Sequence, residues 1–384
     1  MLKNKIIVAS AGSGKTTGII EKVAENLGKS ILITTYTNNN VYEIYSKFHK
    51  HEKFGFIPEK VDIISLNTFF LRHGVKPFQD KILNTDLGRV KSIDYDSEES
   101  YFKNKKNRKY YLNKNNDIFN NKVTEFICDC NIKSDGLIID RLEKIYDIII
   151  IDEIQDINGK YDFEFIELLL SSNIEILLVG DHRQSLLNTN TTAKAVRKEK
   201  GIKIIEKFKK WEEEGLCVIK YKNISYRCCK KICAFADLLF PEIQKTISKR
   251  ADKNEHEGVF IIKNDEEAIK KYYFKYKKRG DNIKVLRTTK KEQAYSLDPL
   301  NIGLAKGKEY DRVIIFFTKD LKKYLTEQNF NFVDGTKCNF YVAITRAKYS
   351  VLLVSDADHC RFKEIQRLKT GLDEVTLFSF IKTD

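Results

Sequence analysis

The sequence predicts an α/β fold built from two tandem parallel-sheet domains. Short runs rich in Ile, Leu and Val recur along the chain, each followed by a polar loop or a helix-like stretch, which is typical of parallel sheets. The first run leads into a glycine-bearing loop of the kind that holds phosphates. With 384 residues, 42% of them hydrophobic and 11% aromatic, the chain can build two or three domain cores.

The predicted strands fall into two sets. The first set comprises residues 6–8, 31–35, 61–65, 147–151 and 175–179, and the second comprises 216–221, 259–262, 283–286, 312–317 and 350–354. We expect a first domain over residues 1–222, a second over 223–384, and a small inserted subdomain at 76–139. Residues 101–122 carry seven Lys or Arg against one Asp without a clean period, so we expect an exposed basic segment there.

Composition narrows the class of protein. The net charge of +14 indicates a polyanionic partner, although a lysine-rich proteome gives the same balance. No apolar run approaches the roughly 20 residues that span a bilayer, and no signal peptide is evident, so we expect a cytoplasmic protein without membrane contact. The eight cysteines, including those of CDC and RCCKKIC, lack partners at zinc spacing, which favours free, buried or partly buried thiols over metal ligands.

The segment ASAGSGKTT, residues 9–17, has the chemistry of a phosphate site, with Ala9 where the pattern usually has its first glycine. Gly12 and Gly14 permit a tight turn that aims backbone N–H groups at phosphate oxygens, and the following helix adds its positive dipole end. Lys15 is placed to reach the β- and γ-phosphates, and the Thr16 hydroxyl to bind Mg²⁺. The expected ATP contacts are Ala11, Gly12, Ser13, Gly14, Lys15, Thr16 and Thr17.

Two further runs deliver polar residues to the same edge of the predicted sheet. DIIIIDEIQDIN, residues 147–158, is a buried strand that ends at Asp152 and Glu153. Asp152 can hold Mg²⁺ through water, and Glu153 can take the proton from an attacking water; the alternative is an ordinary acidic turn. ILLVGDHRQS, residues 176–185, delivers Asp181 and Gln184, and a glutamine there could orient water near a γ-phosphate.

Three segments of the second half place polar residues beside predicted strands. They are SYRC at 225–228, GLAKGKEYDRVIIF at 303–316 and NFYVAITRAKYSVLLV at 339–354. Arginines such as Arg227 and Arg346, supplied from a second domain to a γ-phosphate, act as fingers worth on the order of 10³–10⁵ in rate. They make closure of a cleft depend on the state of the nucleotide, which a translocating motor requires.

An ordered set of motifs resembles those of superfamily 1A DNA helicases of the UvrD/Rep/PcrA type. The set is ASAGSGKTT, TTYTNNN, LNTFF, IIIIDEIQD, VGDHRQS, SYRC, AKGKEYD and YVAITRA, and it runs through nearly the whole chain. The segment SYRCCKKICAFADLLF is also similar to the corresponding part of the helicase subunit of Gabija, a bacterial anti-phage defence system.

The resemblance implies two RecA-like P-loop NTPase domains with Mg²⁺ and ATP between them, and single-stranded DNA, or the tail of a 3′-tailed duplex, lying across both. It implies 3′→5′ movement. By matching position, the catalytic residues are Glu153, Gln184, Arg227 and Arg346, and the metal residues are Thr16 and Asp152. The same match gives Tyr226, Gly307 and Glu309 to the nucleotide, and Thr35, Thr37, Asn38, Thr68 and Phe69 to DNA. A plain strand end is the alternative for the threonines.

The chain departs from the family pattern in several places. A glutamine segment that reads adenine does not lie within the residues ahead of Ala9, so we expect a relaxed choice among nucleoside triphosphates. Thr189 stands where an aromatic residue commonly stacks on a base, a contact worth about 1–3 kcal/mol. Only 75 residues separate Arg227 from Gly303, so we expect no large accessory subdomain in the second domain.

Residues 269–279, IKKYYFKYKKR, combine six basic with four aromatic residues. They could follow phosphates while their rings stack on bases. The pattern more simply predicts an amphipathic helix with its aromatic side buried and its lysines in water.

Two functions from different classes fit the sequence. The first is an ATP-driven single-stranded DNA translocase or helicase. The second is a DNA-sensing regulatory ATPase of an anti-phage complex, which would control a partner nuclease without processive unwinding. A nucleotide kinase or GTPase would need only the phosphate loop and leaves the acidic pair and the arginines unexplained.

Overall fold

A computed structural model describes residues 3–96, 104–157, 159–185, 204–251, 256–289, 294–317, 320–362, 365–370 and 375–379. The chain forms two compact units. The first comprises residues 1–8, 15–182 and 187–221, and the second comprises 9–14, 183–186 and 222–384. Within the described ranges, every helix is too short or too polar to cross a bilayer.

The first unit is organised by a six-stranded sheet in the order β3-β2-β6-β7-β1-β8. The strands are β1 (Lys5–Ala9), β2 (Ile31–Thr35), β3 (Val61–Ser65), β6 (Ile148–Asp152), β7 (Glu175–Gly180) and β8 (Val218–Lys222). The β3-β2, β2-β6, β6-β7 and β7-β1 pairs are parallel. The run at 216–221, expected in the second set, therefore lies in the first sheet, because the Val218 N–H bonds the carbonyl of Asn4, 3.1 Å away, just ahead of β1.

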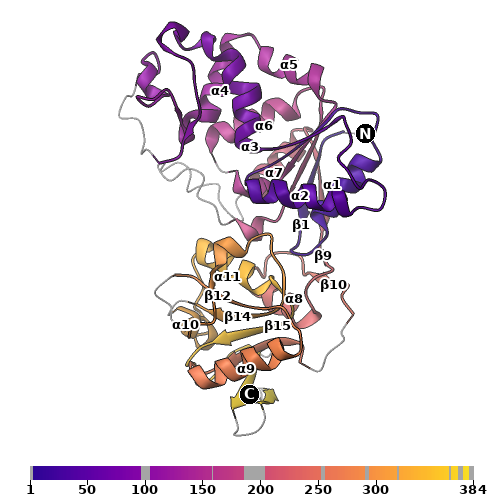
Figure 1. Ribbon diagram of the computed structural model, residues 1–384, viewed down its shortest axis with the longest axis vertical. Helices are drawn as coiled ribbons and strands as arrows, with labels where there is room; N and C mark the ends of the chain where they lie inside the picture. The colour runs from indigo at the N-terminus through magenta and orange to yellow at the C-terminus, as the bar shows by residue number, and fades with distance from the viewer. Residues whose placement is uncertain are drawn as a thin grey trace. The chain divides into compact units, whose positions relative to one another are not determined.

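Alternating side chains build two hydrophobic cores on the two faces of this sheet. Ile31 and Ile33 pack with α1 (Lys15–Ala24) and α2 (Asn38–Lys50). Leu32, between them, belongs to the opposite core. Four helices contribute to that core: α4 (Val123–Lys133), α5 (Leu137–Ile145), α6 (Lys160–Leu170) and α7 (Ile204–Glu213) (Figure 1). Both faces are covered, which explains the continuous apolar composition of the central strands.

The segment expected as an insertion shares the second of these cores. After α3 (Leu66–Phe69) and a π-helix, Phe70–Val75, come short 3-10 turns at Lys76–Lys81, Thr85–Leu87, Arg108–Tyr110 and Asn120–Lys122 and the two-stranded pair β4 (Ile93–Asp94) and β5 (Ile118–Phe119). Phe78, Tyr111 and Phe126 belong to the same buried cluster as the sheet residue Ile149. The segment thus shares its hydrophobic core with the first sheet.

Part of the basic segment is neutralised rather than exposed to a ligand. Lys105 lies 2.9 Å from Glu125 and 2.8 Å from Asp129, and Lys122 lies 2.9 Å from Glu125. Burial alone would raise the pKa of the Glu125 carboxyl, but hydrogen bonds from Lys105, Lys122 and Tyr110 bring it below its ordinary value. Carboxylates of α4 pair with both lysines, and the expectation of an exposed segment is wrong for Lys122, which is partly buried, but holds for Lys105, which is exposed.

The second unit carries a seven-stranded sheet in the order β13-β12-β14-β15-β11-β16-β17. Its strands are β11 (Gly258–Ile262), β12 (Ile283–Arg287), β13 (Leu300–Asn301), β14 (Tyr310–Phe316), β15 (Ala347–Val354), β16 (Ile365–Thr370) and β17 (Val375–Ser379). All neighbours are parallel except the antiparallel pair β16-β17. The fold class predicted from the sequence, two tandem parallel-sheet α/β domains, is confirmed.

Helices cover this second sheet from both sides (Figure 1). On one side lies α9 (Glu266–Lys278), and on the other lie α8 (Lys230–Asp237) and α11 (Asp334–Ile344); the short α10 spans Asp320–Thr326. A small parallel pair, β9 (Ile224–Ser225) with β10 (Ile247–Ser248), precedes the sheet in the chain.

The aromatic and basic segment forms the amphipathic helix α9. Asp265 caps it by accepting the Ala268 N–H at 2.7 Å. Tyr272 and Tyr276 pack into the core against β11, β12, β14 and β15, and the Tyr272 hydroxyl bonds the Ser350 hydroxyl at 2.9 Å. The expectation of a buried aromatic side is confirmed for these two rings, whereas Phe274 is 55% exposed.

All eight cysteines are free thiols, and seven of them are buried. Burial raises the pKa of Cys229 to about 12 and that of Cys217 to about 11, which keeps both protonated at neutral pH. The expectation of buried or partly buried free thiols is confirmed.

Replacing Tyr272 by Ala should lower the free energy of unfolding of the second unit by about 3–5 kcal/mol, because it empties a core position. The matched change Phe274→Ala in the same helix should cost less than about 0.5 kcal/mol, because that ring faces solvent. Urea unfolding followed by circular dichroism measures both. Equal losses in the two variants would contradict the assignment of the buried face.

Candidate functional site

The phosphate loop joins β1 to α1. Gly12 and Gly14 have φ values of 72° and 76°, in the left-handed region where glycine is favoured. The Ser13 hydroxyl is buried and has no hydrogen-bond partner among the described residues. A phosphate oxygen would supply the missing acceptor. Lys15 and the half-buried Thr16 open α1, and Thr17 is exposed. Backbone N–H groups and the helix dipole favour an anion at such a start.

The acidic pair lies at the end of β6, a strand buried at every position. Asp152 is 6% exposed and its Oδ1 accepts the N–H of Glu153 at 3.0 Å. Glu153 has a φ of 59°, unusual for a residue with a side chain. Burial, together with the neighbouring Glu153 charge, raises the pKa of Asp152 to about 7, although Lys15 and the Glu153 N–H oppose the rise.

Gln155 holds the acidic turn in place, and sequence reasoning did not single it out. Its carboxamide donates a hydrogen bond to Glu153 Oε2 and accepts the Asp181 N–H at 3.0 Å. A Cβ at Gly180 would lie 2.3 Å from the Gln155 oxygen, so a side chain there would displace this amide. One side chain thus ties the ends of β6 and β7 together. The available signal was its position two residues after Glu153.

The donor set suits Mg²⁺. The Thr16 hydroxyl and the Asp152 carboxylate are hard oxygen ligands of the kind that Mg²⁺ prefers, and the ion usually adds waters and phosphate oxygens. A bound cation would offset the cost of burying the Asp152 charge. Bound Mg²⁺ would supply charge for the phosphates. Among the described residues, no group of three or more His, Cys, Asp or Glu gathers as a separate metal site.

Arg227 belongs to the second unit, which also includes the phosphate-loop residues 9–14. The N–H of Tyr226 donates to the Gly12 carbonyl at 2.9 Å, and a Cβ at Gly12 would lie 2.5 Å from the Cβ of Arg227. The Arg227 guanidinium donates to Glu309 Oε2 at 3.1 Å and to the Thr345 carbonyl at 3.2 Å. The loop glycine is therefore required for close approach as well as for its backbone angle.

Arg346 is held in the same unit by three sets of contacts. It is 2% exposed, and its Nη2 donates to Gln184 Oε1 at 3.0 Å. Its Nε and Nη1 donate to the carbonyls of Val342 and Lys308 at 3.2 and 3.3 Å. Both predicted catalytic groups, Gln184 and Arg346, are therefore brought together in one hydrogen bond.

The remaining predicted nucleotide contacts lie near Arg227. The Tyr226 side chain is 57% exposed, as a ring available for stacking must be. Glu309 lies beside Arg227 and Lys348. Burial alone would raise its pKa, but these two cations bring it below its ordinary value. Gly307 has a φ of 83° in the loop ahead of β14.

The residues expected to face DNA follow the carboxyl ends of β2 and β3. Asn38 and Thr68 are exposed, and Thr37 caps α2 by accepting the Asn40 N–H at 3.2 Å. Thr35 is fully buried and its hydroxyl accepts from the Asn40 amide. Phe69 is 1% exposed and its ring lies 6.1 Å from that of Phe165. A direct DNA contact by Phe69 or Thr35 is not available in this structure, because Phe69 packs in the core and Thr35 is fully buried. Thr189 lies outside the described residues.

Residues 1–190 match the family model described as an AAA domain. The matched residues include the phosphate loop and the acidic pair at the end of β6. No curated protein matches it. Among solved structures, it is similar to arterivirus nonstructural protein 10, a helicase, at 11% identity, with 94% of this chain and 63% of that chain covered and a TM-score of 0.45.

The PRRSV helicase is similar at 11% identity, with 98% of this chain and 60% of that chain covered and a TM-score of 0.42. A complex of the arterivirus helicase with DNA is similar at 10% identity, with 92% and 61% covered and a TM-score of 0.44. The chain spans about three-fifths of the length of these helicases.

Acidification should weaken the Mg²⁺-dependent part of nucleotide binding at the phosphate loop. The Asp152 carboxyl must be ionised to bind the cation, and its pKa of about 7 means that protons compete below neutral pH. A fluorescent ATP analogue is titrated with and without Mg²⁺. The enhancement, which is the affinity with Mg²⁺ divided by the affinity without it, should fall about tenfold per pH unit below neutrality. Asp152→Asn should bind with little dependence on Mg²⁺ or pH. An enhancement independent of pH in the unmodified protein would contradict the shifted pKa.

Gln155→Ala should lower kcat for ATP hydrolysis about 10–100-fold, the usual effect of removing a group that positions a site residue. The Glu153 carboxylate loses its donor, while the phosphate loop is untouched, so the nucleotide Kd should change little. Steady-state hydrolysis and analogue binding measure the two quantities. Gln328→Ala, at an exposed position, is the control. An unchanged kcat, or a loss confined to Kd, would contradict the positioning role.

Proposed function

We propose that the chain is a DNA-stimulated ATPase that moves along single-stranded DNA as a translocase or helicase of the UvrD type, in the 3′→5′ direction. The observation that carries the proposal is the close packing of the Gly12 backbone against Arg227. A motor needs a nucleotide-responsive arginine beside its phosphate loop, since this couples hydrolysis to movement. A nucleotide kinase or GTPase would not require this packing.

The proposed chemistry divides among the named residues. Lys15 and the loop N–H groups bind the phosphates, and Thr16 and Asp152 hold Mg²⁺. Glu153 accepts the proton of the attacking water, with Gln155 fixing its position. Arg346, already bonded to Gln184, and Arg227 act on the developing charge of the γ-phosphate.

Arg227 and Arg346 are held by protein acceptors in this structure. A triphosphate is a stronger acceptor for a guanidinium than a backbone carbonyl, because it carries charge and can be bonded bidentately. ATP would draw these arginines from the carbonyls of Thr345 and Lys308, and hydrolysis would return them. This exchange is the step that we assign to the motor cycle.

A second function, a cytoplasmic DNA-sensing ATPase that regulates a partner nuclease in anti-phage defence, is favoured by one observation. The described residues between Arg227 and Gly303 form α8, β10, β11, α9, β12 and β13 and their connections, which belong to the second unit. That part of the chain supplies the sheet and its cover rather than an accessory subdomain. A compact ATPase of this kind could signal without unwinding a duplex.

Single-stranded DNA should stimulate ATP hydrolysis, and Glu153→Gln should lower kcat about 100-fold or more while ATP still binds, because the base is lost but the phosphate loop is kept. Hydrolysis with oligothymidylate and binding of a fluorescent analogue test both points. Glu214→Gln, at the exposed residue that follows α7, is the matched control. Hydrolysis retained in Glu153→Gln, or no stimulation by any nucleic acid, would contradict the proposal.

Strand separation distinguishes the two functions. The translocase should separate a 3′-tailed duplex in preference to a 5′-tailed one. The sensor should hydrolyse ATP on the same tails without separating them at any enzyme concentration.

A further inference from the structure

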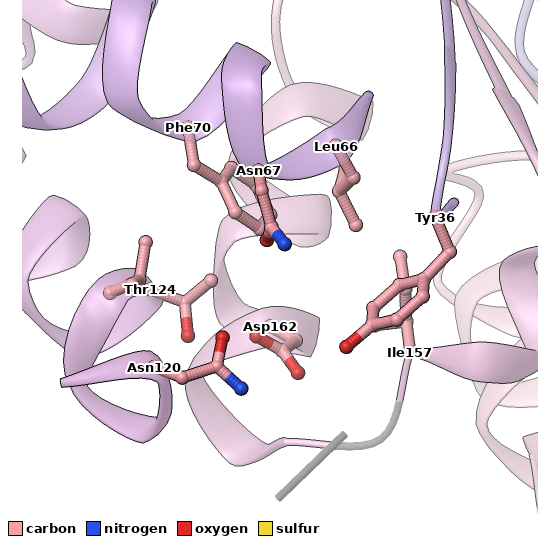
Figure 2. A pocket seen from close by; sticks show the side chains of 9 residues that line it. Tyr36, Leu66, Asn67, Phe70, Asn120, Thr124, Ile157 and Asp162 are labelled. Carbon is pink, nitrogen blue, oxygen red and sulfur yellow. The ribbon is translucent and has the colours of Figure 1, made fainter. Parts of the chain in front are cut away.

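A polar hollow in the first unit has room for water rather than for a larger ligand (Figure 2). Figure 2 shows the polar ends of Tyr36, Asn67, Asn120 and Asp162 directed toward a common space. That space measures about 30 Å³, enough for roughly one or two water molecules, whereas ligand pockets range over about 300–1,000 Å³. A largely buried network of side chains in the second unit, by contrast, connects two parts of the proposed nucleotide site.

This network has Thr246 at its centre, just ahead of β10, and its members all belong to the second unit. The Thr246 hydroxyl donates to Asp237 Oδ1 at 2.9 Å and accepts from Arg183 Nη1 at 3.3 Å. It also lies 3.3 Å from the Ser10 hydroxyl. Because the single Thr246 proton points to Asp237, whose ionised carboxylate only accepts, Ser10 is the donor in this third contact. One donated and two accepted hydrogen bonds use the full capacity of the Thr246 hydroxyl.

Asp237 holds both Thr246 and Arg183 in place. It is the last residue of α8, and its Oδ2 accepts the Thr246 N–H at 2.6 Å. Its Oδ1 lies 3.3 Å from Arg183 Nη1, and the Arg183 side chain is only 3% exposed. A guanidinium at such depth needs a charged partner, because an unpaired buried charge is costly. The geometry of the three side chains is therefore fixed by burial as well as by hydrogen bonds.

One end of the network lies in the phosphate loop. The Ser10 carbonyl accepts the Ser13 N–H at 3.2 Å, and Ser13 also carries the buried hydroxyl that has no hydrogen-bond partner among the described residues. A phosphate is a stronger acceptor for an N–H group than a neutral carbonyl, because it is charged. Nucleotide binding would therefore draw the Ser13 N–H away from Ser10 and change the contact that Ser10 makes with Thr246.

The other end of the network lies at the predicted catalytic groups. Arg183 directly precedes Gln184, whose Oε1 accepts from Arg346 at 3.0 Å. The Arg183 guanidinium also lies over the Tyr341 ring, 4.7 Å from its centroid. Tyr341 belongs to α11, which ends two residues ahead of Arg346. Arg183 is thus joined to both of the segments that carry the Gln184–Arg346 hydrogen bond.

We propose that Thr246 and Asp237 are positioning residues that couple the phosphate loop to Gln184 and Arg346 through Arg183. The inference rests on the proposed function and adds to it a coupling path inside the second unit. Both residues act through other side chains rather than on the nucleotide itself. Buried hydrogen bonds that share a hydroxyl strengthen one another, so a change at Ser10 alters the whole set rather than one contact.

Thr246→Val removes the central hydroxyl and keeps the shape of the side chain. It should lower kcat for DNA-stimulated ATP hydrolysis about 3–30-fold, the range expected for a residue on a coupling network. The Kd for a fluorescent ATP analogue should change less than about twofold, because the donors of the phosphate loop are kept. Thr246→Ser should recover most of kcat, because it restores the hydroxyl. Thr326→Val is the matched control, since that hydroxyl bonds the Lys322 carbonyl at 3.0 Å within α10.

Double-mutant cycles distinguish a connected network from separate local effects. Combining Thr246→Val with Ser10→Ala, or with Gln184→Ala, should lower kcat no further than the more severe single change, because each pair interrupts the same path. Losses that multiply in either cycle would overturn the inference. Circular dichroism melting shows whether Thr246→Val is folded at the assay temperature. If it is not, Ser10→Ala decides the question, because it removes only the donor in the loop and must still lower kcat.

An unchanged kcat in Thr246→Val, a loss confined to Kd, or no recovery in Thr246→Ser would also overturn the inference. In each of these cases, stimulation of the unmodified protein by oligothymidylate would leave the proposed function standing. An unmodified protein that hydrolyses no ATP, with or without nucleic acid, would overturn both.

Discussion

Complete burial of β6 is the constraint on which the rest of the first unit depends. Its isoleucines alternate between two cores, so the strand cannot slide or turn without exposing one of them. The strand therefore delivers Asp152 to a fixed point that is 6% exposed. A charge at such a point is costly unless a cation is near. The raised pKa of Asp152 shows this cost, and the opposing influence of Lys15 shows where it is offset.

The acidic turn depends on one amide side chain more than on its own backbone. Glu153 adopts a left-handed conformation, which costs free energy for a residue with a side chain. Gln155 compensates by bonding the Glu153 carboxylate and the Asp181 backbone together. Gly180 lies beside it, where a side chain would displace this amide. Glu153, Gln155 and Gly180 thus depend on one another to hold the acidic turn.

The second unit places its arginines by a different means. Arg346 is buried and its guanidinium is satisfied by Gln184 and by backbone carbonyls. Arg227 is half-buried and balanced by Glu309, itself close to Lys348. Both guanidinium groups have hydrogen-bond acceptors, so neither carries the desolvation cost of an unpaired buried charge. A competing phosphate has only to exchange one acceptor for another.

The sequence by itself determined the fold class, the phosphate loop and the positions of the acidic pair. These follow from local patterns: apolar runs of strand length, glycines at positive φ, and carboxylates immediately after a strand. It also indicated the amphipathic helix α9, because the spacing of Tyr272 and Tyr276 follows the helical repeat.

Only the tertiary structure decided what depends on partners distant in the chain. It assigned β8 to the first sheet, paired Lys105 and Lys122 with carboxylates of α4, and buried Phe69 in the core. It revealed Gln155 as the tie between the ends of β6 and β7. The physical reason is that a local pattern states which side chains are apolar or charged. Which of them meet is set by how the sheet stacks its strands and helices.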